Sequence, residues 1–407
     1  MSTVERGPFV GINNRLPDHQ LEVVERGRKV GDYLRNAVNV DITDAGTLRR
    51  RAGTARVVEG SDVHSLWAED DDGYYVDGGT LYAFPRRPIR TGMPLHRAAS
   101  FTKTPVGVVW TNGVTLERIT GDASVPLGLA IPNPAPRVVG QGGGSLPAGL
   151  YRVAITAIGP SGEESGATWP VQVQVPANGR IAISRLPGTP VCIYASPQNG
   201  ETLYRVVATS DLRYSIVGAV PLIVPIATVG LRPMPAGQIV RCFNGRLLVA
   251  VGDTLHISEP FAYGLQDPLK GFVQFQGRIT VVEPVDAGVF VCADKTYFLE
   301  GGNPADAAAL REVLPYGGVE GTGGRNKQSK DVFWFSERGL VIGDERGQAK
   351  NVQEQAVAVG RAASGAQLYR DQNGVRQIVS SLFGAEASTA AATSYMEAEI
   401  IRKEVMR

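Results

Sequence analysis

A short pattern of apolar and polar residues recurs along the chain. In each copy a few strand-forming residues precede a polar turn that contains Gly, Asp or Asn, and a second apolar strand follows. The clearest copies span residues 73–84, 107–119, 246–258, 288–301 and 331–344. Strand-turn-strand units that return roughly every 35 to 50 residues are typical of β-propellers. The pattern therefore predicts an all-β chain built from propeller blades.

A weaker copy at 366–382 extends the series. It contains Asn373-Gly374, a pair typical of type I′ hairpin turns, in which both central residues need a positive φ. With this copy the repeats favour a propeller of about six blades, and five or seven remain alternatives. We expect an N-terminal strand to close the ring, because closure joins the first and last blades and removes exposed sheet edges.

The N-terminal region predicts a hairpin of its own. Residues 34–48 alternate between apolar and polar positions around a turn at residues 44–46. Arg49, Arg50 and Arg51 follow directly. On a strand these side chains alternate between two faces, so at least one must be paired or lie at an interface. A solvated edge strand protected by charge is one interpretation, and a contact with another subunit or with nucleic acid is the other.

The repeats are interrupted after the second copy. Residues 131–145 are rich in Pro and then Gly, which indicates a domain boundary, and short strands at regular spacing follow over 135–217. About seven strands fit this segment, as in an immunoglobulin or fibronectin type III module. Tyr151, Trp169 and Tyr194 are candidate aromatic contacts for a binding surface, but their strand positions favour packing in the core of this inserted β-sandwich.

Four segments result from this division. Residues 1–131 hold an N-terminal arm and the first part of the propeller, 132–220 the sandwich, 221–383 the rest of the propeller and 384–407 a C-terminal arm. The arm is rich in Ala and then mixes apolar and charged residues. We expect it to be extended or helical and to order against a partner, with Tyr395 and Met396 at the interface.

Composition supports a packed fold with many turns. The chain has 407 residues, of which 43% are hydrophobic, and it contains 49 Gly and 26 Pro. A disordered chain has fewer hydrophobic residues, and so many glycines and prolines indicate turn-rich β-structure. Lys and Arg number 41 against 40 Asp and Glu. The net charge therefore gives no sign of a nucleic-acid or anionic-membrane partner.

Candidate metal ligands are scattered. Cys192, Cys242 and Cys292 each lie in an apolar strand, which predicts reduced core residues, and the four histidines lack ligand spacing. We expect no cofactor and no metal. We also expect synthesis in the cytosol without a signal peptide or membrane span, because the sequence has no apolar run of signal-peptide length at its start and none near the roughly 18 residues of a transmembrane helix.

Motifs that could carry chemistry are weak. Residues 142–145 predict a flexible linker rather than a phosphate loop, and 317–325 predict a long surface loop that contacts solvent, a partner or a lumen. The acidic residues 69–73 predict a solvated hairpin turn rather than a calcium site, because EF-hand spacing is absent. No serine nucleophile elbow is present. The fold can bring two glycosidase carboxylates together without any spacing pattern in the sequence, so an enzyme stays an alternative. It is the least favoured one, because no motif supports it.

Several segments resemble proteins of tailed bacteriophages. NAVNVDITDAGTLRRRAGTARV near the N-terminus and FWFSERGLVIGDERGQAKNV, with the propeller-type strands, resemble phage tail proteins. The layout is similar to the propeller hub, or nozzle, of short-tailed phages, which also stabilises packaged DNA. AGLYRVAITAIGPSGEESGAT and VCIYASPQNGETLYRV resemble the immunoglobulin-like or fibronectin-like modules of virion proteins, and SYMEAEIIRKEV resembles a tail-protein ending.

The resemblance implies a structural virion protein rather than an enzyme. It would be assembled in the host cytoplasm and would reside in the phage tail. By the nozzle layout, a ring oligomer, commonly a hexamer, surrounds the DNA channel and contacts other tail proteins, with channel DNA as a further partner. A tail protein that binds the host cell surface is the alternative, and a polysaccharide-degrading propeller ranks below both.

Overall fold

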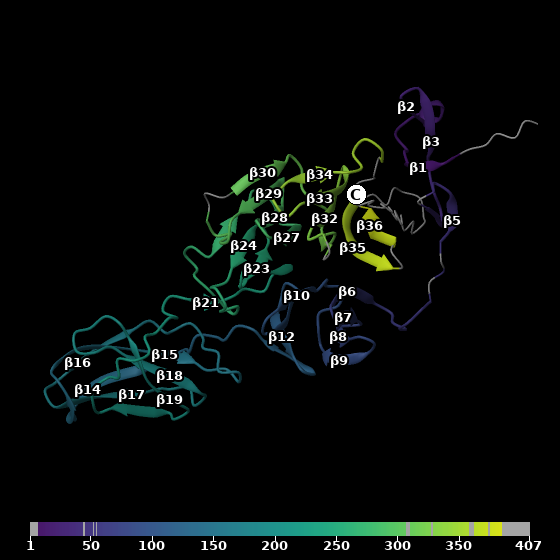
Figure 1. The fold of residues 1–407 in the computed structure, drawn as a ribbon. Coiled ribbons are helices and arrows are strands. Elements are labelled where there is room, and N and C mark those ends of the chain that lie inside the picture. Colours follow the sequence, from purple (N-terminus) through teal and green to yellow (C-terminus); the bar gives the residue numbers. More distant parts are fainter. Residues whose placement is uncertain are drawn as a thin grey trace, which may run out of the picture. The chain divides into compact units, whose positions relative to one another are not determined.

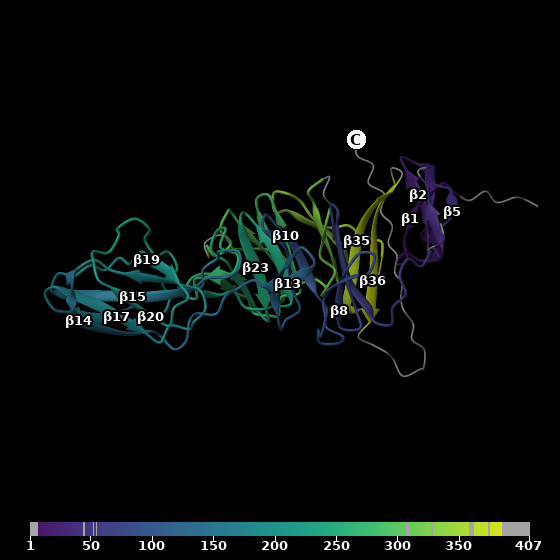
Figure 2. The same ribbon diagram turned by 90° about the horizontal axis from the view of Figure 1, so that it is seen from below.

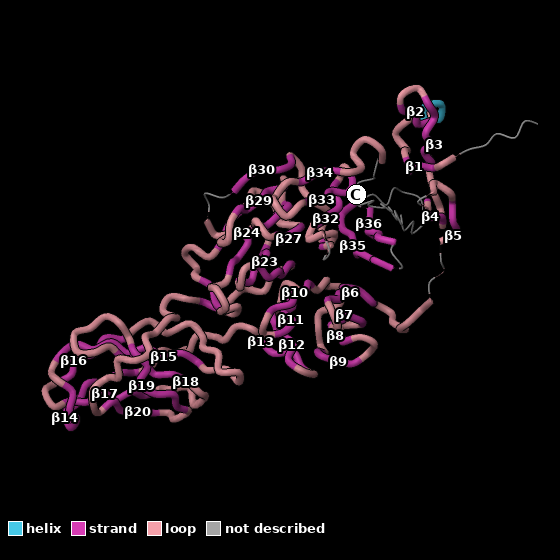
Figure 3. Tube along the Cα trace, in the orientation of Figure 1, coloured by secondary structure: helices cyan, strands magenta, loops and turns pink. Residues whose placement is uncertain are grey.

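The computed structural model describes residues 7–43, 45–51, 53, 55–306, 310–326, 329–357, 362–372 and 375–384. Among these residues the one helical element is the 3-10 turn η1 (Asp18–Gln20). Figure 3 shows this turn in cyan beside β2 (Glu22–Glu25), and strands in magenta elsewhere. The predicted all-β class is confirmed. No described helix has the length and apolar character needed to cross a membrane.

The chain forms two compact units, Asp62–Val273 and the combination of Met1–Ser61 with Gln274–Arg407. The first unit contains three four-stranded antiparallel sheets, and each of the first three repeat copies forms the two central strands of one of them. The strands, in sheet order, are β6 (Val63–Glu69), β7 (Asp72–Asp77), β8 (Thr80–Ala83) and β9 (Arg87–Arg90); β10 (Ser100–Thr104), β11 (Gly107–Thr111), β12 (Leu116–Thr120) and β13 (Ala123–Pro126); and β22 (Ile239–Phe243), β23 (Arg246–Val251), β24 (Thr254–Ile257) and β26 (Phe272–Gln274).

The second and third of these sheets share one core. Val109 of β11, Leu127, Met234 and Val249 of β23 belong to a single buried cluster. Gly128 and Pro233 lie in contact beside this cluster, and a short ladder joins β21 (Arg232–Pro233) to β25 (Leu265–Gln266). The chain therefore leaves and re-enters this pair of sheets at adjacent points.

Between these points the chain folds into a β-sandwich. A three-stranded sheet has the order β14 (Arg137–Leu146), β17 (Gly179–Ser184) and β20 (Arg213–Ile216). A four-stranded sheet has the order β16 (Val171–Val175), β15 (Gly149–Ala157), β18 (Val191–Ala195) and β19 (Tyr204–Thr209). Side chains of both sheets, such as Ile155 and Ile181, form one buried cluster. Figure 1 shows these strands in blue and teal.

The other unit contains two further four-stranded sheets, whose central strands are the fourth and fifth repeat copies. In sheet order they are β27 (Val281–Val285), β28 (Gly288–Cys292), β29 (Thr296–Glu300) and β30 (Leu310–Leu314), then β31 (Gly324–Arg325), β32 (Val332–Ser336), β33 (Gly339–Gly343) and β34 (Ala349–Asn351). The ring of Phe290 packs against Trp334 of the neighbouring sheet, with 5.3 Å between ring centroids. Such sheets are propeller-like blades.

The sixth repeat copy differs from the others. It forms a two-stranded hairpin of β35 (Ala362–Gln372) and β36 (Val375–Gly384), long strands that lie side by side in Figure 2. Asn373 and Gly374, its predicted turn residues, lie outside the described residues. The described part of this copy is thus two strands short of the other blades.

The N-terminal strands pair among themselves. β1 (Phe9–Ile12) runs parallel to β3 (Arg28–Leu34), which also pairs with β2, and β4 (Val40–Ile42) forms the expected hairpin with β5 (Leu48–Arg50). The prediction that an N-terminal strand closes the last blade is wrong for the described residues, because the last hairpin gains no strand from this region. Phe9 instead donates its N–H to the Gly46 carbonyl at 2.7 Å, which fastens the hairpin to β1.

Two tryptophans provide a test of the core. Trp334 is fully buried, whereas Trp169 is 76% exposed. We expect Trp334→Ala to lower the free energy of unfolding by about 3–5 kcal/mol, because it removes a large buried side chain and leaves a cavity. Trp169→Ala should change it by less than about 0.5 kcal/mol. Urea unfolding followed by circular dichroism measures both, and equal losses would contradict this assignment of the core.

Candidate interaction surfaces

The predicted arginine surface lies on an exposed hairpin. All three residues of β5 are exposed, so neither face of this strand is covered. Arg49 lies 3.8 Å from the carboxylate of the buried Asp41, while Arg50 is opposite Val40. Arg51 donates its backbone N–H to Asn39. Arg49 and Arg50 thus lie on an exposed strand, and Arg51 follows directly after it. Tyr395 and Met396 lie outside the described residues.

The sandwich aromatics have different environments. Tyr151 and Tyr194 are buried, which confirms the core prediction for them, but it is wrong for Trp169. Trp169 lies before β16 rather than in a strand, and its neighbour Thr168 accepts the backbone N–H of Ile155 at 3.1 Å. An open cavity of about 380 Å³ adjoins Trp169, and its lining also includes Ile131, Pro132, Asn133, Ala135 and Thr168.

A buried polar cluster stabilises the sandwich. The Glu164 carboxylate accepts hydrogen bonds from the hydroxyls of Thr156 and Tyr194 and from the Cys192 thiol, at 2.7, 2.8 and 3.4 Å. Burial, and then Glu164, raise the pKa of Tyr194 and bring the pKa of the Cys192 thiol to about 11. Both groups therefore stay protonated at neutral pH. The cluster joins β15 and β18 to the segment before β16.

The acidic turn is a hairpin turn between β6 and β7, as predicted. Lys103 of β10 contacts the carboxylates of Asp70 and Asp72 at 3.1 and 3.0 Å. The hydrogen bonds to Asp72 and then Asp70 raise the Lys103 pKa. The Lys103 amine therefore neutralises carboxylate charge at the position where a bound metal ion would do so. Across the described chain, no group of His, Cys, Asp and Glu side chains has a metal-binding arrangement.

The structure corrects the predictions for both glycine-rich segments. Residues 142–145 belong to strand β14 rather than to a flexible linker. The loop 317–325 lies against its blade rather than in solvent: a Cβ on Gly317 would come within 2.1 Å of the Ala293 carbonyl oxygen. A Cβ on Gly323 would meet the Glu283 carboxylate at 2.4 Å. These glycines are therefore explained by close backbone approach rather than by ligand binding.

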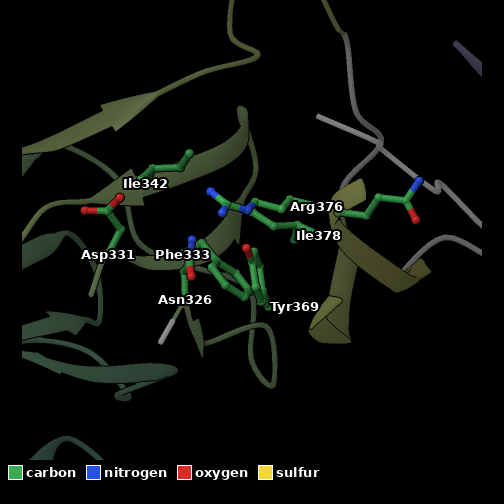
Figure 4. Close-up of a pocket in the computed structure, with 8 residues that line it drawn as sticks. Asn326, Asp331, Phe333, Ile342, Tyr369, Arg376 and Ile378 are labelled. Atoms are coloured by element: carbon green, nitrogen blue, oxygen red, sulfur yellow. The ribbon is translucent and has the colours of Figure 1, made fainter. Parts of the chain in front are cut away.

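The last hairpin packs on the preceding sheet. Leu382 of β36 joins a buried cluster with Phe333 and Phe335 of β32, and Tyr369 and Ile378 pack against it. Figure 4 shows Tyr369 and Phe333 lining the small pocket at this seam, which measures about 30 Å³. That volume holds only one or two water molecules. The seam between the hairpin and the preceding sheet is therefore a packing contact rather than a ligand site.

Comparison with known proteins gives only distant structural similarity. No protein-family model and no curated protein matches the sequence. Similar solved structures include BBS1N in complex with ARL6DN, 9% identical over 80% of this chain and 90% of that chain with a TM-score of 0.31. The WD40 domain of Neurospora crassa Pan2 is 9% identical over 78% and 85%, with a TM-score of 0.30. The extracellular domain of a hybrid two-component system from B. thetaiotaomicron is 10% identical over 80% and 39%, with a TM-score of 0.31.

Gly317 tests the close packing of its loop. We expect Gly317→Ala to destabilise the protein by about 1–3 kcal/mol, because the added methyl group overlaps a backbone oxygen that cannot move alone. Gly142→Ala is the matched control, since no atom lies within 4 Å of the point that its Cβ would occupy and its φ is not left-handed. Thermal unfolding compares the two. Equal melting temperatures would show that the loop is not packed as described.

The cysteines give a second test. Cys192 and Cys292 are buried, Cys242 is half-buried, and none forms a disulfide. Burial raises the pKa of the Cys292 thiol to about 12. We expect a thiol reagent at pH 8 to modify Cys242 first and the other two only after unfolding, because a reagent needs both access and thiolate. Rapid modification of all three in the native protein would contradict these environments.

Proposed function

We propose that this protein is a structural component of a bacteriophage tail. In this proposal its copies form a hub or nozzle ring around the DNA channel and contact other tail proteins, and the protein catalyses no reaction. The sequence resemblance is the starting point. The structural support is the insertion of a complete sandwich between two blades that still share one core. In this proposal the blades form the scaffold, and the sandwich is an additional domain that they carry.

The strand order of the sandwich supports the immunoglobulin-like part of the proposal. If β15 is taken as strand C, the order β16-β15-β18-β19 corresponds to C′-C-F-G of immunoglobulin-type sandwiches. The pairing of β14 with β17 then corresponds to B with E, and β20 occupies the place of strand D. We infer that the module is an immunoglobulin or fibronectin III variant in a propeller of about six blades.

Host-surface binding is the second candidate, and Trp169 favours it. Its indole is exposed beside an open cavity with the exposed Asn133. An aromatic face and a side-chain amide are groups that protein interfaces commonly use. In this candidate the inserted module contacts the host cell surface during adsorption, while the blades still hold the protein in the tail.

Assembly is the deciding experiment. We expect the purified chain to form a ring, with six copies as the expected number, in light-scattering mass measurement and electron microscopy. The same ring should lie in the tail of assembled particles. A protein that stays monomeric at tens of micromolar and is missing from particles would overturn the proposal. Particles that assemble without residues 135–217 but no longer adsorb to host cells would support the second candidate.

A further inference from the structure

β36 has one unpaired edge. Its ladder with β35 runs from Gln372 opposite Val375 to Ala362 opposite Gly384, and the described residues supply no strand on its other side. The Gly365 N–H bonds to the Glu320 carbonyl and so points away from β36. Because hydrogen-bonding direction alternates along a strand, Ile378, Ser380 and Leu382 direct their backbone N–H groups to the free edge.

This edge lacks the usual protection against pairing. Exposed edge strands generally carry lysines, prolines, bulges or inward charges that prevent association. From Gln377 to Gly384, β36 has no charged residue and no proline. Its pairing with β35 is regular from Gln377 to Phe383, which lies opposite Ser364. Arg376 is its one charged side chain, and it pairs with Asp371 of β35 at 3.4 Å. The edge is therefore suited to a further strand.

The hairpin holds this edge in place. An isolated two-stranded hairpin is marginally stable in water. Here Leu382 is buried with Phe333 and Phe335, and β35 bonds to Glu320 near its start. The edge is thus ordered before any partner arrives, which lowers the entropic cost of adding a strand.

The β4–β5 hairpin has the complementary form. The backbone N–H of Thr43 donates to the Thr47 carbonyl, and that of Arg51 donates to the Asn39 carbonyl, so these residue pairs bond across the hairpin. Because the bonding direction alternates along a strand, the N–H groups of Leu48 and Arg50 point outward. Leu48 is 43% exposed, and both faces of β5 are open. In its own chain this hairpin is fastened to β1 and leaves β36 unpaired.

We propose that β5 of one copy pairs with β36 of a second copy. The two hairpins then form a four-stranded sheet across the subunit boundary, equal in strand number to the five other blades. One copy contributes the edge of β5 and the other contributes the edge of β36. Because these are different surfaces, the contact is head-to-tail, and such contacts close into a ring when the rotation between neighbouring copies permits. The inference rests on the proposed function and identifies the contact that would build its ring.

Two proline variants test the pairing. Ser380→Pro and Arg50→Pro each remove one edge N–H without removing a hydrogen bond of the existing ladders, and proline is tolerated on edge strands. We expect each variant alone to be monomeric in light scattering. Ser380→Ala and Arg50→Ala are the matched controls, since they lose the same side chains and keep the N–H, and we expect both to form rings.

Mixing the proline variants separates the outcomes. Ser380→Pro retains a β5 edge that can pair, and Arg50→Pro retains a β36 edge that can pair. An equimolar mixture of the two should therefore give a one-to-one dimer. This complementation also shows that both variants are folded. Rings that persist in either proline variant, or a mixture that stays monomeric, would overturn the strand pairing and leave the proposed function intact. A wild-type chain that stays monomeric and is missing from particles would instead overturn both the strand pairing and the proposed function.

Discussion

The need to cover both faces of the central strands governs this structure. Every residue of β28 and of β32 is buried, which is possible only when each face of the strand meets other packed groups. Continuous apolar strands such as these cannot form an isolated sheet in water. The blades therefore pack face to face, and the Phe290–Trp334 contact shows how large aromatic rings fill the space between two of them. Repetition of the central hairpin follows from this requirement.

Close backbone approach is a second result of the same packing. Gly318 lies where a Cβ would come closer to Trp334, Val281 and Cys292 than ordinary contact allows, and Gly140 in the sandwich lies against the Gln174 carbonyl. Glycine here allows a loop, as at Gly318, or a strand, as at Gly140, to lie directly against a sheet. The high glycine content thus serves packing as well as turns, and a glycine-rich sequence is no measure of flexibility in this chain.

The central hairpins could be predicted because their pattern is local. Alternation and turn residues such as Gly78-Gly79, both with positive φ, identify β7 and β8 without any knowledge of their neighbours. The errors concern information that lies elsewhere in the chain. The sequence around Gly317 does not indicate that the Ala293 carbonyl lies against it. The sequence around Trp169 does not indicate that Thr168 bonds to Ile155. The absence of a closing N-terminal strand among the described residues depends on how β4 and β5 pair, which composition and spacing leave open.

The contact between Gly128 and Pro233 has a consequence for the history of such chains. Because the two ends of the insertion meet, any domain whose termini lie close together could occupy this position without altering the register of β13 or β22. The blades would then persist through evolution while the attached domain is exchanged between relatives by recombination. Such an exchange would replace the outer domain and leave the packing of the blades unchanged.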